Sequence, residues 1–291
     1  MKVGVIGLGA MGGYMALNFY YADFLHMVWN RTPARAKEIA AKISVKIASG
    51  PGELASECDL VLTCVSRDAD VLEMMQAIAA SIKPDAIVAD TSTVSAETAK
   101  QAAAILAEKG AHFLDCPVSG GVEGARNGTL AIMAGGDPEI LERVKHALSA
   151  IAANIAYIGP TGSGQACKAV NQLMAAGINQ AVCEALLFGE SMGLDMDKVV
   201  DIVSTGAAGN WFLEHRGKNI LAGKFTPGFK LALHHKDLSI CKSMLKNVSE
   251  SPLPLLDMTL AQYQQLIDQG HGDEDISALY RLRKEQFKRK S

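Results

Sequence analysis

The chain has 291 residues, of which 49% are hydrophobic and 20% charged, and its formal net charge is −3. This length favours two domains over one, and the composition is typical of a soluble globular protein with a large core. The small negative charge argues against nucleic acid or an acidic membrane as the main partner.

Neither the cysteines nor the apolar segments indicate an extracellular or membrane protein. The six cysteines form no Cys-x-x-Cys pair and show no regular spacing, which favours reduced, mostly buried thiols in a cytoplasmic protein. Glycines interrupt the apolar N-terminal run, so it makes a poor signal peptide. No purely apolar segment reaches the roughly 18 residues of a membrane span, and we expect none.

The N-terminal residues combine an apolar strand, a glycine-rich turn and a helix. The strand is expected at residues 2–6 and the helix at residues 13–19. The turn between them consists of Gly7, Leu8, Gly9, Ala10, Met11 and Gly12. In such a turn the first two glycines let the backbone approach a pyrophosphate, the third allows close packing, and the helix start offers free N–H groups. This order predicts a dinucleotide site; the alternative is a turn with a purely structural role.

The second strand, residues 25–29, ends before Asn30, Arg31 and Thr32. An NAD-specific fold usually carries Asp or Glu here to bind the ribose 2′-hydroxyl. A carboxylate would repel a 2′-phosphate, whereas a guanidinium can bind it through paired hydrogen bonds. The sequence therefore favours NADP(H) over NAD(H), with all three residues in cofactor binding. The alternative is that Arg31 only covers solvent-exposed structure.

Strands and helices continue to alternate up to residue 162. Helices are expected at residues 34–42, 71–80, 96–109 and 139–150, and strands at residues 60–65, 86–89, 131–134 and 155–158. This alternation predicts an α/β domain with a doubly wound, parallel, Rossmann-type sheet, in which ligands bind at the carboxyl ends of strands. Val65, Ser66 and Thr93 follow two of these strands and are expected to line the cofactor. For Ser66 and Thr93 the alternative is ordinary turn and cap chemistry.

Further along the chain, Ser119, Gly120 and Gly121 can turn several backbone N–H groups toward one point, which suits a carboxylate. A long helical segment then covers residues 163–193 and would span roughly 42 Å for some 28 helical residues. Lys168, Asn171 and Gln172 are spaced i, i+3 and i+4 and share one face of it. Because these polar groups need polar partners, we expect the helix to join two domains and to carry a proton donor into the cleft between them.

Past residue 193 the sequence has almost no strand-like alternation. Helices are expected at residues 197–204, 211–221, 231–248, 254–269 and 275–288, with a basic, solvated end. Trp211 and Phe212 are expected to pack this helical domain; the alternative is that they also shape the substrate pocket. His234 and His235 lack metal-ligand spacing, so no metal is expected.

Four groups of segments together resemble the β-hydroxyacid dehydrogenase family, which includes 3-hydroxyisobutyrate dehydrogenase and related semialdehyde reductases. They are residues 7–13, residues 115–121 with 124–125 and 128–130, residues 162–168 with 171–172, and residues 236–238. By this resemblance Lys168 is the catalytic acid/base, and Ser119, Gly120 and Gly121 hold the substrate carboxylate. The resemblance also implies that Asn171 orients the substrate, and that Lys236 lies at the site, near the nicotinamide and substrate.

Two positions depart from the family pattern. Gln172 stands where some members carry a second asparagine, which is similar to the tartronate semialdehyde reductase branch, and Cys116 stands where alanine is common. Imine reductases usually lack a lysine at the position of Lys168. The 6-phosphogluconate dehydrogenases have a longer second domain and a histidine near the lysine. Both of these related groups are therefore disfavoured.

The expected organisation is a dinucleotide-binding domain at residues 1–162, an interdomain helix at residues 163–193 and an all-helical domain for substrate and oligomerisation at residues 194–291. Apolar residues on more than one face of the long helix predict a homodimer or homotetramer. The expected reaction is NADP(H)-dependent hydride transfer to or from a small carboxylate-bearing aldehyde or hydroxyacid, with Gln172 supporting the substrate or cofactor side. The alternatives are an NAD-linked 3-hydroxyisobutyrate dehydrogenase and a non-catalytic NADPH-binding sensor or scaffold.

Overall fold

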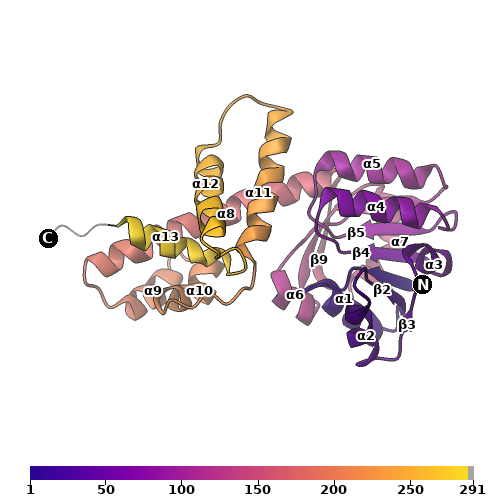
Figure 1. Cartoon of the computed structure of the whole chain (residues 1–291), viewed down its shortest axis with the longest axis horizontal. Helices are drawn as coiled ribbons and strands as arrows, with labels where there is room; N and C mark the ends of the chain where they lie inside the picture. The colour runs from indigo at the N-terminus through magenta and orange to yellow at the C-terminus, as the bar shows by residue number, and fades with distance from the viewer. Residues whose placement is uncertain (288–291) are drawn as a thin grey trace. The chain divides into compact units, whose positions relative to one another are not determined.

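The structure, a computed structural model, describes residues 1–287. The chain forms two compact units, Met1–Lys168 and Ala169–Ser291. The first is an α/β unit, and the described part of the second is helical, as the element order in Figure 1 shows. The expected fold class is confirmed: a Rossmann-type sheet, a long helix and an all-helical C-terminal region. The finer division at residues 162 and 193 stays a prediction.

The first unit is built on one nine-stranded sheet. Its strands, in spatial order, are β3 (Lys46–Ile47), β2 (Leu25–Trp29), β1 (Val3–Ile6), β4 (Leu60–Thr63), β5 (Ile87–Asp90), β6 (His112–Asp115), β8 (Leu130–Gly135) and β7 (Val118–Ser119), with β9 (Ala152–Gly159) paired to β8. Neighbours from β3 to β6 are parallel, as expected. β8 runs antiparallel to its neighbours β6 and β7, whereas β9 runs parallel to β8.

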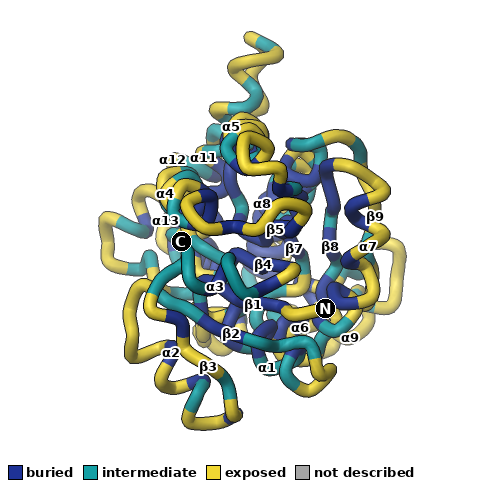
Figure 2. The backbone as a smooth tube through the Cα atoms, turned by 90° about the vertical axis from the view of Figure 1, so that its right-hand side faces the viewer, coloured by how far each residue is buried: buried dark blue, intermediate teal, exposed yellow. Residues whose placement is uncertain are grey.

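Helices cover both faces of this sheet. They are α1 (Gly12–Tyr21), α2 (Pro33–Ala40), α3 (Pro51–Glu57), α4 (Asp68–Ala79), α5 (Ala96–Ala107), α6 (Gly121–Asn127) and α7 (Pro138–Leu148). Alternate strand residues enter two separate cores: Val5 packs in the core with α1 and α7, and Ile6 in the core with α3, α4 and α5. β1, β4 and β5 are buried along their whole length (Figure 2). This two-sided burial explains why their sequences are continuously apolar rather than alternating.

The long helix is α8 (Ser163–Ser191), which begins in the first unit and continues into the second. It ends two residues before Gly193, whose φ of +71° is the left-handed conformation that glycine favours after a helix. Several of its apolar side chains are exposed, namely Val170, Met174 and Phe188. The homodimer or homotetramer stays a prediction that light scattering can measure.

The second unit contains α9 (Met196–Ser204), α10 (Trp211–Leu221), α11 (Leu231–Lys246), α12 (Pro254–Asp268), the short 3₁₀ helix η1 (Ile276–Ala278) and α13 (Leu279–Gln286). Phe212 is buried in its core, as expected. The expectation that Trp211 packs there is wrong: its side chain is 54% exposed, and its ring stacks on His215 with centroids 4.3 Å apart. Trp211 is the first residue of α10, and its ring lies at the surface over the Arg216 guanidinium, 5.3 Å from Cζ to the ring centroid. The basic positions 288–290 lie outside the described residues.

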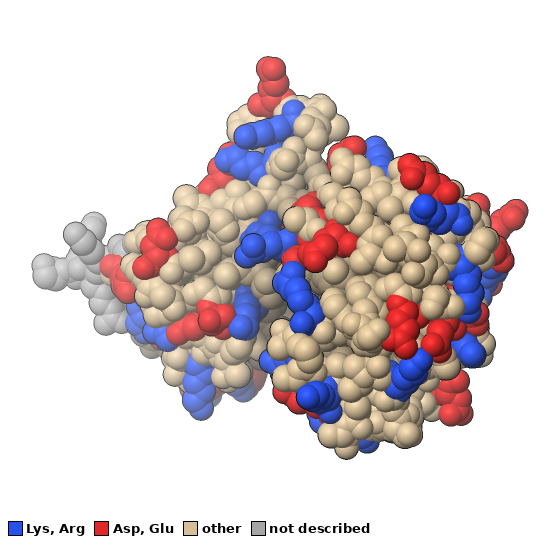
Figure 3. All heavy atoms as spheres, turned by 45° about the vertical axis from the view of Figure 1, so that its right-hand side comes forward, with Lys and Arg blue, Asp and Glu red and all other residues tan. Residues whose placement is uncertain are grey.

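Over residues 1–287, no helix is both long and apolar enough to cross a membrane. Basic and acidic side chains are interspersed on the face drawn in Figure 3, without one dominant sign. All six cysteines are free, and Cys58, Cys116, Cys183 and Cys241 are buried. Burial raises the pKa of the Cys58 thiol to about 12, so this side chain behaves as a packing residue.

Candidate active site

The three glycines of the turn between β1 and α1 serve different purposes. Gly7 has a φ of +91°, and a Cβ atom there would overlap the carbonyl oxygen of Cys64. A Cβ atom at Gly12 would overlap the carbonyl oxygen of Gly7. In contrast, a Cβ atom at Gly9 would have no protein atom within 4 Å. Residues 10–11 beside it are exposed or half-buried. The fold itself therefore requires Gly7 and Gly12, while the open side at Gly9 fits the close approach of a dinucleotide pyrophosphate.

Asn30 ties the end of β2 to this turn. Its Oδ1 accepts a hydrogen bond from the Leu8 N–H at 2.8 Å, and its Nδ2 donates to the Thr32 carbonyl at 2.9 Å. The amide thus fixes the turn while placing no negative charge there. Arg31 is 69% exposed, and its Nη1 lies 2.9 Å from Oδ1 of Asp70. The sequence suggested a cofactor role for Arg31 but gave no sign of this carboxylate partner.

A buried hydrogen-bond network joins the carboxyl ends of β4 and β5. Asp90 is fully buried, and its Oδ1 accepts from Thr63 Oγ1 at 2.6 Å and from Ser92 Oγ at 2.7 Å. Ser92 Oγ in turn accepts from the Val65 N–H at 2.9 Å. Val65, expected at the cofactor, is therefore held through Ser92 by a carboxylate that sequence reasoning missed.

The same edge of the sheet holds the first turn of α8. Asp115, the last residue of β6, accepts hydrogen bonds from the N–H groups of Gly162 at 2.8 Å and Gln165 at 3.0 Å. The side chain of Gln165 donates to the Ser92 carbonyl at 2.8 Å. Lys168 follows one turn later and is only 7% exposed. Asp115 and Gln165 were not singled out from the sequence, although both lie inside the segments that carry the family resemblance.

The other predicted residues of the first unit also follow strands at this edge. Ser66 is exposed and Thr93 is half-buried. Ser119 ends β7, and the two glycines after it have φ values of +126° and +62°. Only glycine adopts consecutive values of this kind without strain, so Gly120 and Gly121 give the backbone a conformation closed to other residues. This supports the anion-binding turn expected from the sequence.

In the second unit, polar residues of α8 and α11 bind one another. Asn171 Nδ2 donates to Gln172 Oε1 at 2.8 Å, and Gln172 Nε2 donates to Asp237 Oδ2 at 2.6 Å. Nζ of Lys236 lies 2.8 Å from the other oxygen of Asp237. Asp237 is buried and thus joins two of the predicted site residues. The sequence signal that could have identified Asp237 is its position directly after Lys236, because a buried carboxylate needs a charged or amide partner.

His234 supports the same part of α8. It is fully buried, with Nε2 3.2 Å from the Gln172 carbonyl oxygen and Nδ1 3.2 Å from the Tyr263 hydroxyl. Because a carbonyl only accepts, Nε2 carries the proton, and in the neutral ring Nδ1 accepts from Tyr263. Its neighbour His235 is half-buried, and burial lowers its pKa. The structure therefore gives His234 a role in packing, which the sequence had left open.

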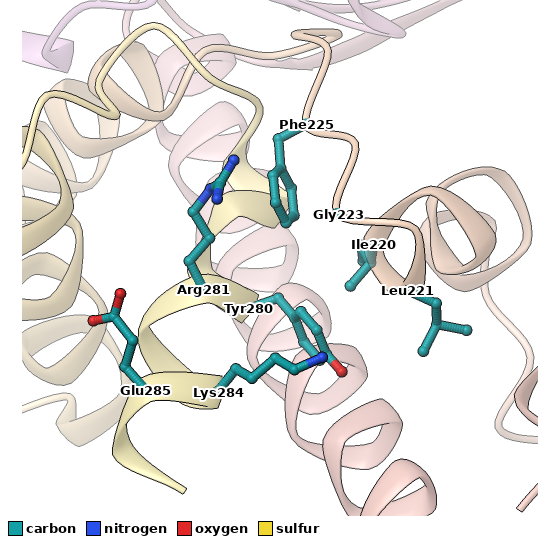
Figure 4. Close-up of a pocket in the computed structure, with 8 residues that line it drawn as sticks. All are labelled: Ile220, Leu221, Gly223, Phe225, Tyr280, Arg281, Lys284 and Glu285. Carbon is teal, nitrogen blue, oxygen red and sulfur yellow. The ribbon is translucent and has the colours of Figure 1, made fainter.

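A pocket of about 320 Å³ lies in the helical unit and is drawn in Figure 4. It is lined by Ile220, Leu221, Gly223, Phe225, Tyr280, Arg281, Lys284 and Glu285. Its cations have carboxylate partners: Arg281 binds Glu274 at 2.9 Å, and Lys284 lies 3.2 Å from Glu190. None of the predicted site residues lines it, so it is not the candidate active site.

Two family models match consecutive parts of the chain. Residues 2–159 match the NAD binding domain of 6-phosphogluconate dehydrogenase, and residues 162–283 match the NAD-binding domain of NADP-dependent 3-hydroxyisobutyrate dehydrogenase. The chain belongs to the β-hydroxyacid dehydrogenase family. It is therefore an NAD(P)-dependent oxidoreductase, and the resemblance inferred from its motifs is confirmed.

Individual relatives match over most of the chain. An oxidoreductase of Shewanella frigidimarina is 37% identical and covers 97% of this chain and 98% of its own. The 2-hydroxy-3-oxopropionate reductase of Escherichia coli is 38% identical over 84% of this chain and 85% of its own. Among solved structures, 3-hydroxyisobutyrate dehydrogenase of Mycobacterium tuberculosis with L-serine has a TM-score of 0.87 at 29% identity, covering 97% and 98% of the two chains.

The glycine-rich turn yields a paired prediction. Gly9→Ala is expected to keep the fold and melting temperature of the wild type, because its Cβ meets no protein atom, yet to weaken dinucleotide binding by about tenfold or more. Gly12→Ala, the control, is expected to destabilise the protein, because its Cβ overlaps backbone. Fluorescence titration with NADPH and thermal unfolding measure the two effects. Wild-type affinity in folded Gly9→Ala would contradict the assignment of this turn to the pyrophosphate.

Asp90 yields a prediction about pH. Burial raises its pKa from 3.8 to about 6, although hydrogen bonds from Thr63 and Ser92 oppose the shift. Its Oδ2 also finds no hydrogen-bond donor within the described part of the chain. Because the pKa of Asp90 is higher in the folded than in the unfolded chain, its contribution to stability is complete below about pH 4. This contribution is lost as the pH rises through about 6.

Asp90→Asn removes this titration. The stability of the variant relative to wild type is therefore expected to rise between pH 4.5 and pH 7.5 by on the order of 2 kcal/mol. Urea unfolding at the two pH values measures the difference. A relative stability that does not change with pH would show that folding does not raise the pKa of Asp90.

Proposed function

We propose that this chain is an NADP(H)-dependent reductase of small aldehyde acids that also oxidises the corresponding hydroxyacids. The observation that carries the proposal is the setting of Lys168. This lysine is buried, and it lies one turn after a helix start that Asp115 and Gln165 tie to the carboxyl edge of the sheet. Burying an amine costs free energy, so a lysine fixed here is better explained by chemistry than by packing.

Lys168 would act as the proton donor. When bound, the nicotinamide of the cofactor supplies the hydride. As an ammonium group, Lys168 would stabilise the negative charge that develops on the substrate carbonyl oxygen and would donate a proton to it from Nζ. In alcohol oxidation the neutral amine would take that proton back. Ser119, Gly120 and Gly121 would bind the substrate carboxylate through backbone N–H groups and so orient the carbonyl.

Asn171 would hydrogen-bond the reacting oxygen from the next turn of α8. Its amide donates to Gln172, which Asp237 fixes in turn, so the orientation of the asparagine is set by buried partners. Gln172 would then act on the substrate mainly through Asn171. Lys236, bound to the same Asp237, would add positive potential beside the substrate and cofactor.

The cofactor would lie along the turn at residues 7–12 and the loops that contain Val65, Ser66 and Thr93. The absence of a carboxylate from Asn30, Arg31 and Thr32 supports NADP(H). The nearby carboxylate of Asp70 favours the second candidate, an NAD-linked 3-hydroxyisobutyrate dehydrogenase, because it offsets the charge of Arg31. A sensor or scaffold without catalysis is disfavoured, since binding alone would not need Lys168.

The first test is a substrate and cofactor panel. We expect reduction of 2-hydroxy-3-oxopropionate, the substrate named for the Escherichia coli relative, or of glyoxylate, succinic semialdehyde or methylmalonate semialdehyde. We also expect a higher kcat/KM with NADPH than with NADH. A clear NADH preference together with 3-hydroxyisobutyrate oxidation would instead establish the second candidate. Tight NADPH binding without turnover of any compound would point to the sensor.

The second test concerns Lys168. Lys168→Ala is expected to lower kcat by about 10²–10⁴-fold, because it removes the proton donor, while NADPH still binds. The matched control is Lys145→Ala, which removes an exposed lysine from α7 and should leave kcat unchanged. Steady-state kinetics and NADPH titration measure both variants. Near-normal turnover by folded Lys168→Ala would refute the assignment.

A further inference from the structure

Arg31 is the cation that the proposed cofactor preference depends on, and two carboxylates of α4 lie beside it. Its Nη1 is 2.9 Å from Oδ1 of Asp70 and 3.9 Å from Oε2 of Glu73. These acids are three residues apart and share one helix face. Arg31 and Glu73 are mostly exposed, whereas the Asp70 side chain is only 18% exposed. Asp70 is therefore the mostly buried partner of a solvent-exposed guanidinium.

Asp70 also has a local structural use, which must be weighed. It lies in the first turn of α4, where a negative charge interacts favourably with the helix dipole. That turn already carries Asp68, whose Oδ1 accepts hydrogen bonds from the Ser95 N–H at 2.9 Å and Thr98 Oγ1 at 2.6 Å. A second acid is thus not needed to begin the helix. The dipole does not explain why Asp70 faces an arginine 39 residues earlier.

We propose that Asp70 competes with the 2′-phosphate of NADP(H) for Arg31 and so limits how strongly the chain discriminates NADP(H) from NAD(H). This inference rests on the proposed role of Arg31 in cofactor binding. A 2′-phosphate must either displace the carboxylate or share the guanidinium with it, and two anions on one cation repel each other. NAD(H) carries no such phosphate and leaves the ion pair intact. Asp70 therefore penalises one cofactor and not the other.

The charge balance supports a dual-cofactor site. Arg31 contributes one positive charge, and Asp70 with Glu73 contributes two negative charges within 4 Å of it. Near a surface such pairs interact weakly and are screened by salt, so the effect on affinity is a moderate factor and not a complete exclusion. An arginine alone at this position would select NADP(H) more strongly.

The experiment measures binding of NADPH and NADH by fluorescence titration, which does not depend on turnover. Asp70→Asn keeps the size of the side chain and removes its charge. It is expected to tighten NADPH binding about threefold to fivefold and to leave NADH binding unchanged within about twofold. The matched control is Asp85→Asn, which removes an exposed carboxylate that binds Arg143 at 2.9 Å before β5, at the opposite end of the strands. It should change neither affinity.

A double-mutant cycle identifies the cause. In an Arg31→Ala background, Asp70→Asn should change NADPH affinity by less than about twofold, because nothing remains to compete for. A full effect in that background, no effect in the wild-type background, or equal changes for both cofactors would each overturn the inference. The wild-type ratio of the two affinities tests the NADP(H) preference separately. If wild type prefers NADH, that preference is wrong, yet Asp70→Asn must still move the ratio toward NADPH.

Discussion

The capping of α8 by the end of β6 is the constraint on which the candidate site depends. The Asp115 carboxylate accepts hydrogen bonds from backbone N–H groups that have no intrahelical partner at the start of a helix. The approach is so close that a Cβ atom at Gly164 would overlap the Met133 and Asp115 carbonyl oxygens. A glycine in the first turn is therefore a steric requirement. The position of Lys168 follows, because one helical turn separates it from a helix start bound to the sheet.

This arrangement costs stability, because two carboxylates are buried at one sheet edge. Burial raises the pKa values of both Asp90 and Asp115, and the charge of Asp115 adds to the effect at Asp90. In return, one oxygen of Asp90 binds Thr63 and Ser92 and thereby fixes two strand ends at once. Ser92 extends this to Val65 and, through its carbonyl, to Gln165. A buried network of this kind contributes rigidity more than free energy.

The sequence predicted what depends on local pattern. Apolar strands and periodic helices were predicted at most of the positions where the structure has them. The strands β3, β6 and β7 and the helices α3 and α6 were not predicted, since segments of two to seven residues carry little readable periodicity. The partner of Arg31 lies 39 positions away in the sequence, and that of Gln172 lies 65 positions away. The antiparallel direction of β8 likewise depends on pairing with a separate strand. No local signal specifies such pairings, so the candidate residues were found without the carboxylates that hold them.

Those carboxylates divide the site into parts with different tolerance to change. Within the first unit, buried hydrogen bonds to Asp115 hold the helix start before Lys168, and within the second, a buried hydrogen bond to Asp237 holds Gln172. The proposed adenosine end relies on Arg31, whose partner Asp70 interacts with it across a solvated surface. Removing a buried partner leaves a desolvated group unpaired, whereas changing an exposed charge shifts an affinity by a small factor. Substitutions on α4 can therefore change the cofactor preference without altering the hydrogen bonds that position Lys168.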